Sequence, residues 1–159
     1  MSLSWTEPSK GDRAFIAEVV GAFSAGKASD VFRDAWRFLM TTVVPLNERA
    51  DWDHIRCEFW LDSGRCVIFV AHAEKVDRID RGCCQIVSRD LMSVWERCAS
   101  RFADSDEDFS RAIVEEERKL MSFAVDAANA VAKEMTGLRG VDIEFWDADA
   151  SLLESYTIG

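Results

Sequence analysis

The chain has 159 residues, of which 48% are hydrophobic and 30% charged, and its formal net charge is −10 at pH 7. This composition excludes a disordered chain, and the longest unbroken apolar run, residues 66–71, is far shorter than the roughly 18–20 residues that a membrane span requires. The negative charge disfavours nucleic acid and anionic membranes as partners and favours a basic protein.

The expected cellular location is the cytoplasm. Residues 1–8 lack the basic and apolar regions of a secretory signal peptide. The five cysteines fit that location, because their number is odd and no Cys-x-x-Cys spacing occurs. Most of them are expected to be small buried hydrophobes. Cys83 and Cys84 are harder to place, because adjacent residues of a strand point to opposite faces of the sheet.

Two helices are expected at the start of the chain. Apolar residues at helical spacing predict a first helix that begins at Ser9 or Asp12 and runs to about residue 24. A second helix can be capped by Ser29 or Asp30 and is stopped by Pro45. The short gap between them predicts a helical hairpin. The apolar stripe of the first helix is Phe15, Ile16, Val19, Val20 and Phe23.

The central stretch, residues 53–73, predicts a β-hairpin, because two β-rich runs flank a Ser-Gly turn signal. The second run is apolar on both faces, so we expect it to lie inside the sheet and the first run to lie nearer an edge. Two registers stay open. A two-residue turn pairs Phe59 with Ile68, whereas a three-residue loop pairs Phe59 with Val67, and both keep an apolar face.

The register decides whether the only two histidines meet. The three-residue loop alone sets His54 directly opposite His72, with carboxylates nearby. Two histidines and a carboxylate can hold zinc or iron, so a metal-binding or hydrolytic enzyme centred on His54 and His72 is an alternative function. The plainer interpretation is a partly exposed, pH-sensitive strand end.

The second half of the chain predicts one short strand, two helices and a final strand. Residues 83–87 are the short strand, and Ser88 can cap a helix that runs to about residue 103. The segment 104–106 breaks the pattern and begins a long helix, which Gly137 ends. Apolar and polar residues then alternate over residues 141–146, as in a half-buried strand.

These elements predict a single α+β domain over residues 1–159. Their order, α-α-β-β-(β)-α-α-β, is not the regular alternation of a parallel α/β sheet. We therefore predict an antiparallel sheet of about three to four strands with helices packed on one face. Glu116 interrupts the apolar stripe of the long helix, so the first two turns of that helix are expected to project past the core.

Acidic residues concentrate near the carboxyl end, where residues 101–159 contain 14 acidic and 6 basic residues. Acidic side chains around a tryptophan on the final strand offer an aromatic anchor and steer a basic partner. The hairpin's polar face extends this surface if the two strands are neighbours, and the alternative is that both tryptophans lie under a helix or the tail. The predicted partner-binding residues are Trp146, Asp142, Glu144, Asp147, Asp149, Trp60 and Glu58.

The size, the acidity and a final strand reading Val-Asp-Ile-Glu-Phe-Trp-Asp, residues 141–147, resemble the small acidic α+β immunity proteins of bacterial toxin systems. That resemblance implies a protein that neutralises a nuclease by covering its basic active site, and no functional residue is carried over from it. An acidic secretion chaperone has similar proportions and is a further alternative. The leading function is an acidic protein-binding module with a basic protein as partner and with no catalytic residue, metal or cofactor.

Overall fold

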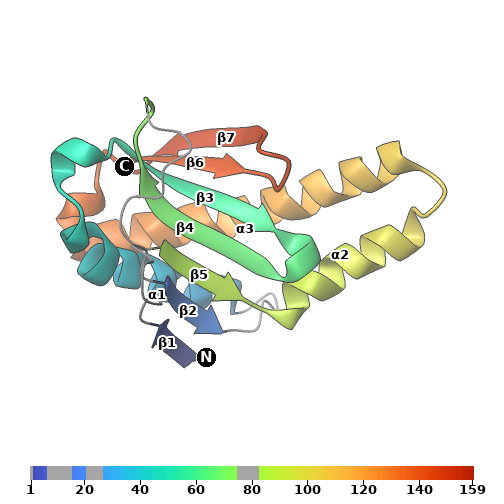
Figure 1. The fold of residues 1–159 in the computed structure, drawn as a ribbon, viewed down its shortest axis with the longest axis horizontal. Coiled ribbons are helices and arrows are strands. Elements are labelled where there is room, and N and C mark those ends of the chain that lie inside the picture. The colour runs from blue at the N-terminus through green and yellow to red at the C-terminus, as the bar shows by residue number, and fades with distance from the viewer. Residues whose placement is uncertain (1, 7–15, 21–26, 75–82) are drawn as a thin grey trace.

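The computed structural model describes residues 2–6, 16–20, 27–74 and 83–159, and side chains in the last two of these ranges. Seven strands form one sheet in the order β1-β2-β5-β4-β3-β6-β7 (Figure 1). The strands are β1 (Ser2–Thr6), β2 (Ile16–Val20), β3 (His54–Trp60), β4 (Arg65–Ala71), β5 (Cys83–Val87), β6 (Asp142–Trp146) and β7 (Leu152–Thr157). The α-helices are α1 (Ala28–Phe38), α2 (Arg89–Arg101) and α3 (Asp106–Glu134). The α+β class is thus confirmed.

The sheet is mixed and larger than the predicted antiparallel sheet of three to four strands. β2 pairs in parallel with β5, and β3 pairs in parallel with β6, while the other neighbours are antiparallel. A parallel pair requires a long crossover connection, and between β3 and β6 this connection includes α3. The tail forms β7, which the sequence did not reveal because its polar and apolar residues do not alternate cleanly.

The predicted first helix is wrong over residues 16–20, which form strand β2. Ile16, Val19 and Val20 satisfy helical spacing, but a short run of β-branched residues fits a strand equally well, and periodicity alone does not separate the two. The remainder of that predicted helix lies outside the described residues. The second helix is confirmed as α1, but Lys27 and not Ser29 or Asp30 is its N-cap. The helix continues through a π-helical turn (Leu39–Val43) and a 3-10 turn (Val44–Leu46) that contains Pro45.

The predicted hairpin forms, but in neither of the two predicted registers. Phe59 pairs with Cys66, and His54 pairs with Ala71, so His54 does not lie opposite His72. A 3-10 turn, η4 (Leu61–Ser63), and the left-handed Gly64 make the connection longer than either prediction allowed. β4 lies between β3 and β5, as expected for a strand that is apolar on both faces. β3 is not near an edge, because β6 pairs with its other side.

Helices α1 and α3 pack on one side of the sheet, behind it in Figure 1. They cross closely, and the indole N–H of Trp36 donates a hydrogen bond of 2.9 Å to the carbonyl oxygen of Ala124. Burial of large apolar side chains between these helices and the sheet is the main stabilising term. Fully buried members of this core include Phe32, Trp36, Leu39, Ile55, Phe59, Ile68, Ile86, Ile143 and Phe145.

Helix α2 and the first turns of α3 form a helical hairpin that extends beyond the sheet at one end of the molecule (Figure 1). Ser88 caps α2 by accepting the N–H of Asp90, and Ser105 caps α3 by accepting the N–H of Asp108. Leu91 is the only buried residue of α2, and the buried residues of α3 begin at Glu117. The predicted projection of the first turns of α3 is therefore confirmed.

The cysteines on the central strands are buried. Cys57 and Cys66 lie on the helix side of the sheet with their sulfurs 3.3 Å apart, and Cys84 faces the same core. Cys83 lies in a small apolar cluster with Phe69. Burial raises the pKa of the Cys83 thiol to about 11, so it is protonated and unreactive at neutral pH.

Gly64 connects the sheet to the helical hairpin. Its carbonyl oxygen accepts the N–H of Ser88, and a Cβ built at position 64 would lie 2.6 Å from the Ser88 carbonyl oxygen. We predict that Gly64→Ala lowers the free energy of unfolding by about 2–3 kcal/mol, because the backbone must shift in addition to adopting a φ of +68°. Urea unfolding followed by circular dichroism measures the loss.

Gly140 is the matched control for this prediction. Its φ is +76°, but nothing lies within 4 Å of a Cβ built there. Gly140→Ala is therefore expected to lower the free energy of unfolding only by the conformational cost of a positive φ, about 1 kcal/mol. Equal losses of stability in Gly64→Ala and Gly140→Ala would show that the approach of Ser88 is not a constraint.

Candidate functional site

Five of the seven predicted partner-binding residues share the sheet face opposite α1 and α3. β6 lies beside β3, and the parallel register places Glu144 next to Arg56 and Trp146 next to Glu58. Asp142, Glu144 and Trp146 therefore point to the same side as Glu58 and Trp60, as the alternation predicted. The side chain of Trp60 is exposed, with 36% of its residue surface accessible, and Trp146 is half-buried.

Polar contacts within the chain engage the acidic side chains of this face, which we call the open sheet face because α1 and α3 pack on the other side. Arg56 is buried, its guanidinium carbon lies 4.0 Å from the centroid of the Trp146 ring, and its Nη2 lies 2.7 Å from a carboxylate oxygen of Glu58. The indole N–H of Trp146 donates to Glu144 at 3.1 Å. Asp142 accepts the hydroxyl of Thr157. One face of the Trp146 ring is thus already covered by a cation, and Glu58 already has its counter-charge.

Asp53 lies between the two histidines. Its carboxylate is 2.5 Å from Nδ1 of His54 and 3.9 Å from Nδ1 of His72, and Nε2 of His54 is 3.3 Å from Glu144. Partial burial raises the pKa of Asp53, but hydrogen bonds from His54 and from the N–H of Ala73 outweigh it, so the pKa is lowered overall. Within residues 27–74 and 83–159, no group of three or more His, Cys, Asp or Glu is arranged to hold a metal ion.

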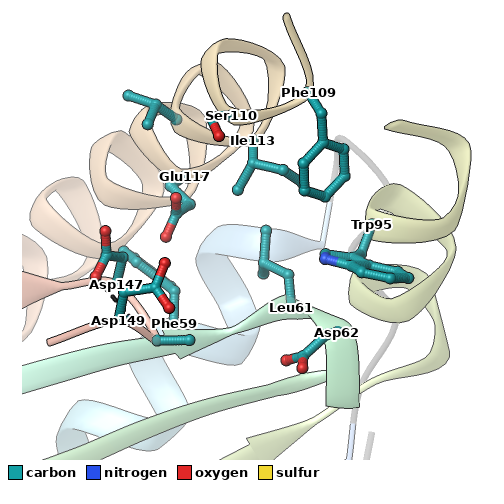
Figure 2. Close-up of a pocket in the computed structure, with 12 residues that line it drawn as sticks. Phe59, Leu61, Asp62, Trp95, Phe109, Ser110, Ile113, Glu117, Asp147 and Asp149 are labelled. Atoms are coloured by element: carbon teal, nitrogen blue, oxygen red, sulfur yellow. Dashed lines mark hydrogen bonds between the residues drawn. The ribbon is translucent and has the colours of Figure 1, made fainter. Parts of the chain in front are cut away.

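A pocket of about 250 Å³ lies between the helical hairpin and the end of the sheet (Figure 2). We call it the acidic pocket. Strand β3 and η4, helices α2 and α3, and the turn between β6 and β7 all contribute to its walls. Its apolar lining is Phe59, Leu61, Trp95, Phe109, Ile113 and Val114. Its carboxylates are Asp62, Glu117, Asp147 and Asp149. None of the 12 lining residues drawn in Figure 2 is basic.

Glu117 is the buried carboxylate of this pocket. Only 2% of its surface is exposed, and it forms no hydrogen bond or ion pair with the described residues. Figure 2 shows its carboxylate directed toward those of Asp147 and Asp149. Burial raises the pKa of Glu117 to about 7, and the charges of Asp147 and Asp149 add to that increase. A buried carboxylate without a counter-charge is costly, so the pocket favours a cation.

The turn between β6 and β7 fixes the other side of the pocket. Oδ1 of Asp147 accepts the N–H groups of Asp149 and Ser151, at 3.0 and 2.8 Å, and Ala150 takes a positive φ of 60°. An aspartate that binds the backbone two residues ahead is a standard way to close such a turn. Asp147 and Asp149 thus belong to this pocket and not to the open sheet face that carries the other five predicted residues.

Glu117 was missed in the sequence analysis, although a signal was present. It lies three, four and seven residues before Leu120, Met121 and Ala124, which are all buried on one side of α3. The sequence Glu115-Glu116-Glu117 places three acids in a row, so composition alone suggests a solvated segment. Only the spacing along the helix shows that Glu117, unlike Glu115 and Glu116, lies on the same side as these buried residues.

No family model matches the chain, and no curated protein or solved structure matches it significantly. In the described part of the chain, no helix combines the length and the apolar character needed to cross a bilayer. The function must therefore be inferred from the chemistry of the site itself.

The buried position of Glu117 predicts a specific dependence of stability on pH. The native protein holds this proton more tightly than the unfolded chain, so its contribution to stability declines as pH rises from about 4.5 to about 7. Glu117→Gln removes that decline. We expect the variant to gain free energy of unfolding over the wild type between pH 4.5 and 7. The gain is on the order of 3 kcal/mol at most, because one pKa unit corresponds to about 1.4 kcal/mol and the pKa of Glu117 rises from 4.5 to about 7.

Urea unfolding at pH 5 and pH 8 measures this gain, with Glu115→Gln as the control. Glu115 is exposed and lies two residues away on the same helix, so its replacement changes the net charge equally without touching the pocket. A stability difference between Glu117→Gln and the wild type that is the same at both pH values would contradict the burial of the Glu117 carboxylate.

Proposed function

We propose that this chain is an acidic protein-binding module that captures a cationic protein, and that the acidic pocket anchors the partner. One observation carries the proposal: four carboxylates line a pocket whose described lining contains no base, and Glu117 is buried there without a counter-charge beside Asp147 and Asp149. A positive group from a partner would supply that counter-charge inside a partly desolvated site, where ion pairing is strongest.

The open sheet face supports the proposal less directly. Glu58 and Glu144 already contact Arg56, His54 or Trp146 within the chain, so they offer a partner little free charge. Among the described residues, Asp142 of this face accepts only the neutral hydroxyl of Thr157. Asp147 and Asp149 lie in the acidic pocket beside Glu117, also without a cation in the described lining. Electrostatic attraction by the overall charge of −10 would speed the encounter with a basic protein, and the pocket would then hold one group of that protein.

A narrower form of the proposal is an immunity or inhibitor protein of the cytoplasm that covers the basic active site of a toxin. A nuclease surrounds its substrate with cations, and such a surface matches an acidic pocket at the base of a protruding helical hairpin. A toxin gene beside the gene for this chain would support this form of the proposal, whereas a metabolic operon would oppose it.

Affinity capture from a lysate of the source cells tests the proposed function. The pocket variant is Asp147→Asn with Asp149→Asn, in which the asparagine at position 147 keeps the oxygen that closes the turn. We expect a protein of net positive charge to be retained in stoichiometric amount by the wild type and to bind the pocket variant at least tenfold more weakly. Surface plasmon resonance with the captured protein measures the loss.

The matched control is Asp104→Asn with Asp106→Asn. Both aspartates are exposed near the tip of the helical hairpin, so this control changes the net charge by the same amount. Equal weakening by the two double variants would show that total charge, and not the pocket, attracts the partner. Retention of only neutral or acidic proteins would contradict the proposed function.

A further inference from the structure

We propose that the acidic pocket receives a single arginine side chain of the partner, whose guanidinium lies among Glu117, Asp147 and Asp149 and whose aliphatic stem lies along the apolar wall. This inference rests on the proposed function and names the chemical group that the partner inserts. It follows from the volume of the pocket, the gathering of three carboxylates at one end, and the directions from which its carboxylates approach.

The volume of the pocket suits one side chain. Its roughly 250 Å³ lies below the range of about 300–1,000 Å³ that is typical of small-molecule sites. A long side chain can displace the water in a space of this size, whereas a helix or strand of a partner does not fit inside.

Three of the four carboxylates gather at one end of the pocket. Figure 2 shows Glu117, Asp147 and Asp149 together, while Ile113 and Trp95 lie toward the other end, where Asp62 is also found. A ligand that reaches the three gathered carboxylates past Ile113 and Trp95 would be apolar along its length and cationic at its tip. Arginine and lysine side chains have this construction, because an aliphatic stem carries a terminal charge.

The carboxylates favour arginine over lysine. Glu117 comes from α3, while Asp147 and Asp149 come from the turn beyond β6, so the acceptors approach from two directions. A guanidinium presents five N–H donors in a planar fork and can bind carboxylates on two sides at once. It is also more weakly hydrated than an ammonium, which lowers the cost of placing it beside a buried carboxylate.

The aromatic wall lies beside the aliphatic stem of the side chain. The rings of Trp95 and Phe109 meet edge to face, with centroids 5.7 Å apart and an interplanar angle of 87°, and both line the pocket. Figure 2 shows both rings away from the carboxylates of Glu117, Asp147 and Asp149, so they would contact the stem and not the guanidinium.

The charges of the lining indicate a side chain of a protein rather than free arginine. Free arginine carries an α-ammonium and an α-carboxylate beside its stem. Every charged residue among the described lining residues is acidic, so the lining could pair with the α-ammonium but would repel the α-carboxylate, which would find no basic partner. In a polypeptide the same atoms form uncharged peptide groups, and the repulsion is absent.

Binding of this group depends on the ionisation of Glu117. The charged groups that face Glu117 are Asp147 and Asp149 from the β6–β7 turn. Asp62 of η4 lines the pocket farther from Glu117, and α2 contributes the uncharged Trp95. The pKa of Glu117 is raised to about 7, so its charge appears between pH 6 and pH 8. The affinity for a guanidinium is therefore expected to increase severalfold across this interval in the wild type and to stay nearly constant in Glu117→Gln.

The test uses the full chain and three blocked amino acids, the N-acetyl methylamides of arginine, lysine and citrulline. Two-dimensional NMR follows the indole N–H signal of Trp95, which Trp95→Phe identifies. We expect the arginine compound to shift this signal with a millimolar dissociation constant and to bind at least tenfold more tightly than the lysine compound. The uncharged citrulline compound is expected not to bind.

Two variants test the role of the buried carboxylate. Glu117→Gln should weaken arginine binding at pH 8 at least tenfold, and Glu115→Gln should leave it unchanged.

The outcomes separate this inference from the proposed function. Equal binding of the arginine and lysine compounds, both lost in Glu117→Gln, would overturn the arginine inference and leave a cation-binding module. The arginine inference would also be overturned if the arginine compound caused no shift of the Trp95 signal while Asp147→Asn with Asp149→Asn still weakened capture of the partner. The proposed function would stand in that case. Unblocked arginine that binds as tightly as the blocked compound would overturn the assignment to a protein side chain. Arginine binding without capture of any cationic protein would refute the proposed function and keep the pocket chemistry.

Discussion

The parallel pairing of β3 with β6 determines where the other features of the molecule lie. Strands that run in the same direction must be joined by a crossover, and here the chain returns along α3. Helix α3 has 29 residues and is about 43 Å long at 1.5 Å per residue, whereas the seven residues of β3 span about 23 Å. A helix so much longer than the strand it covers must extend past the sheet. The helical hairpin is that extension, and the acidic pocket lies where α3 leaves the sheet.

The two groups of acidic side chains differ in how their charges are balanced. On the open sheet face, Arg56 lies against both Glu58 and Trp146, and His54 lies between Asp53 and Glu144, so three of the carboxylates have a basic side chain beside them. In the pocket the described lining offers no such partner. Unbalanced buried charge lowers stability, and proteins retain it mainly where binding or catalysis uses it. This contrast gives more functional information than the total charge.

The sequence indicated most of the elements but few of their relative positions. Ser88 and the break at residues 104–106 marked the starts of α2 and α3 correctly, and the alternation over β6 placed Glu144 and Trp146 on one face. Ile16–Val20 was misassigned because five apolar-rich residues are too few to distinguish helical from strand spacing. The hairpin register failed because several alignments keep an apolar face, and only the backbone of Gly64 and its approach to Ser88 select one.

The continuity of α3 has a consequence for how a partner would be received. One unbroken helix forms both the outer half of the hairpin and a wall of the core, so the two cannot rotate independently without bending the helix. A ligand in the pocket would touch the sheet end, the hairpin and the β6–β7 turn in positions that are already fixed before it arrives. Little conformational freedom would then be lost on association, so even a small contact area could give a long-lived complex.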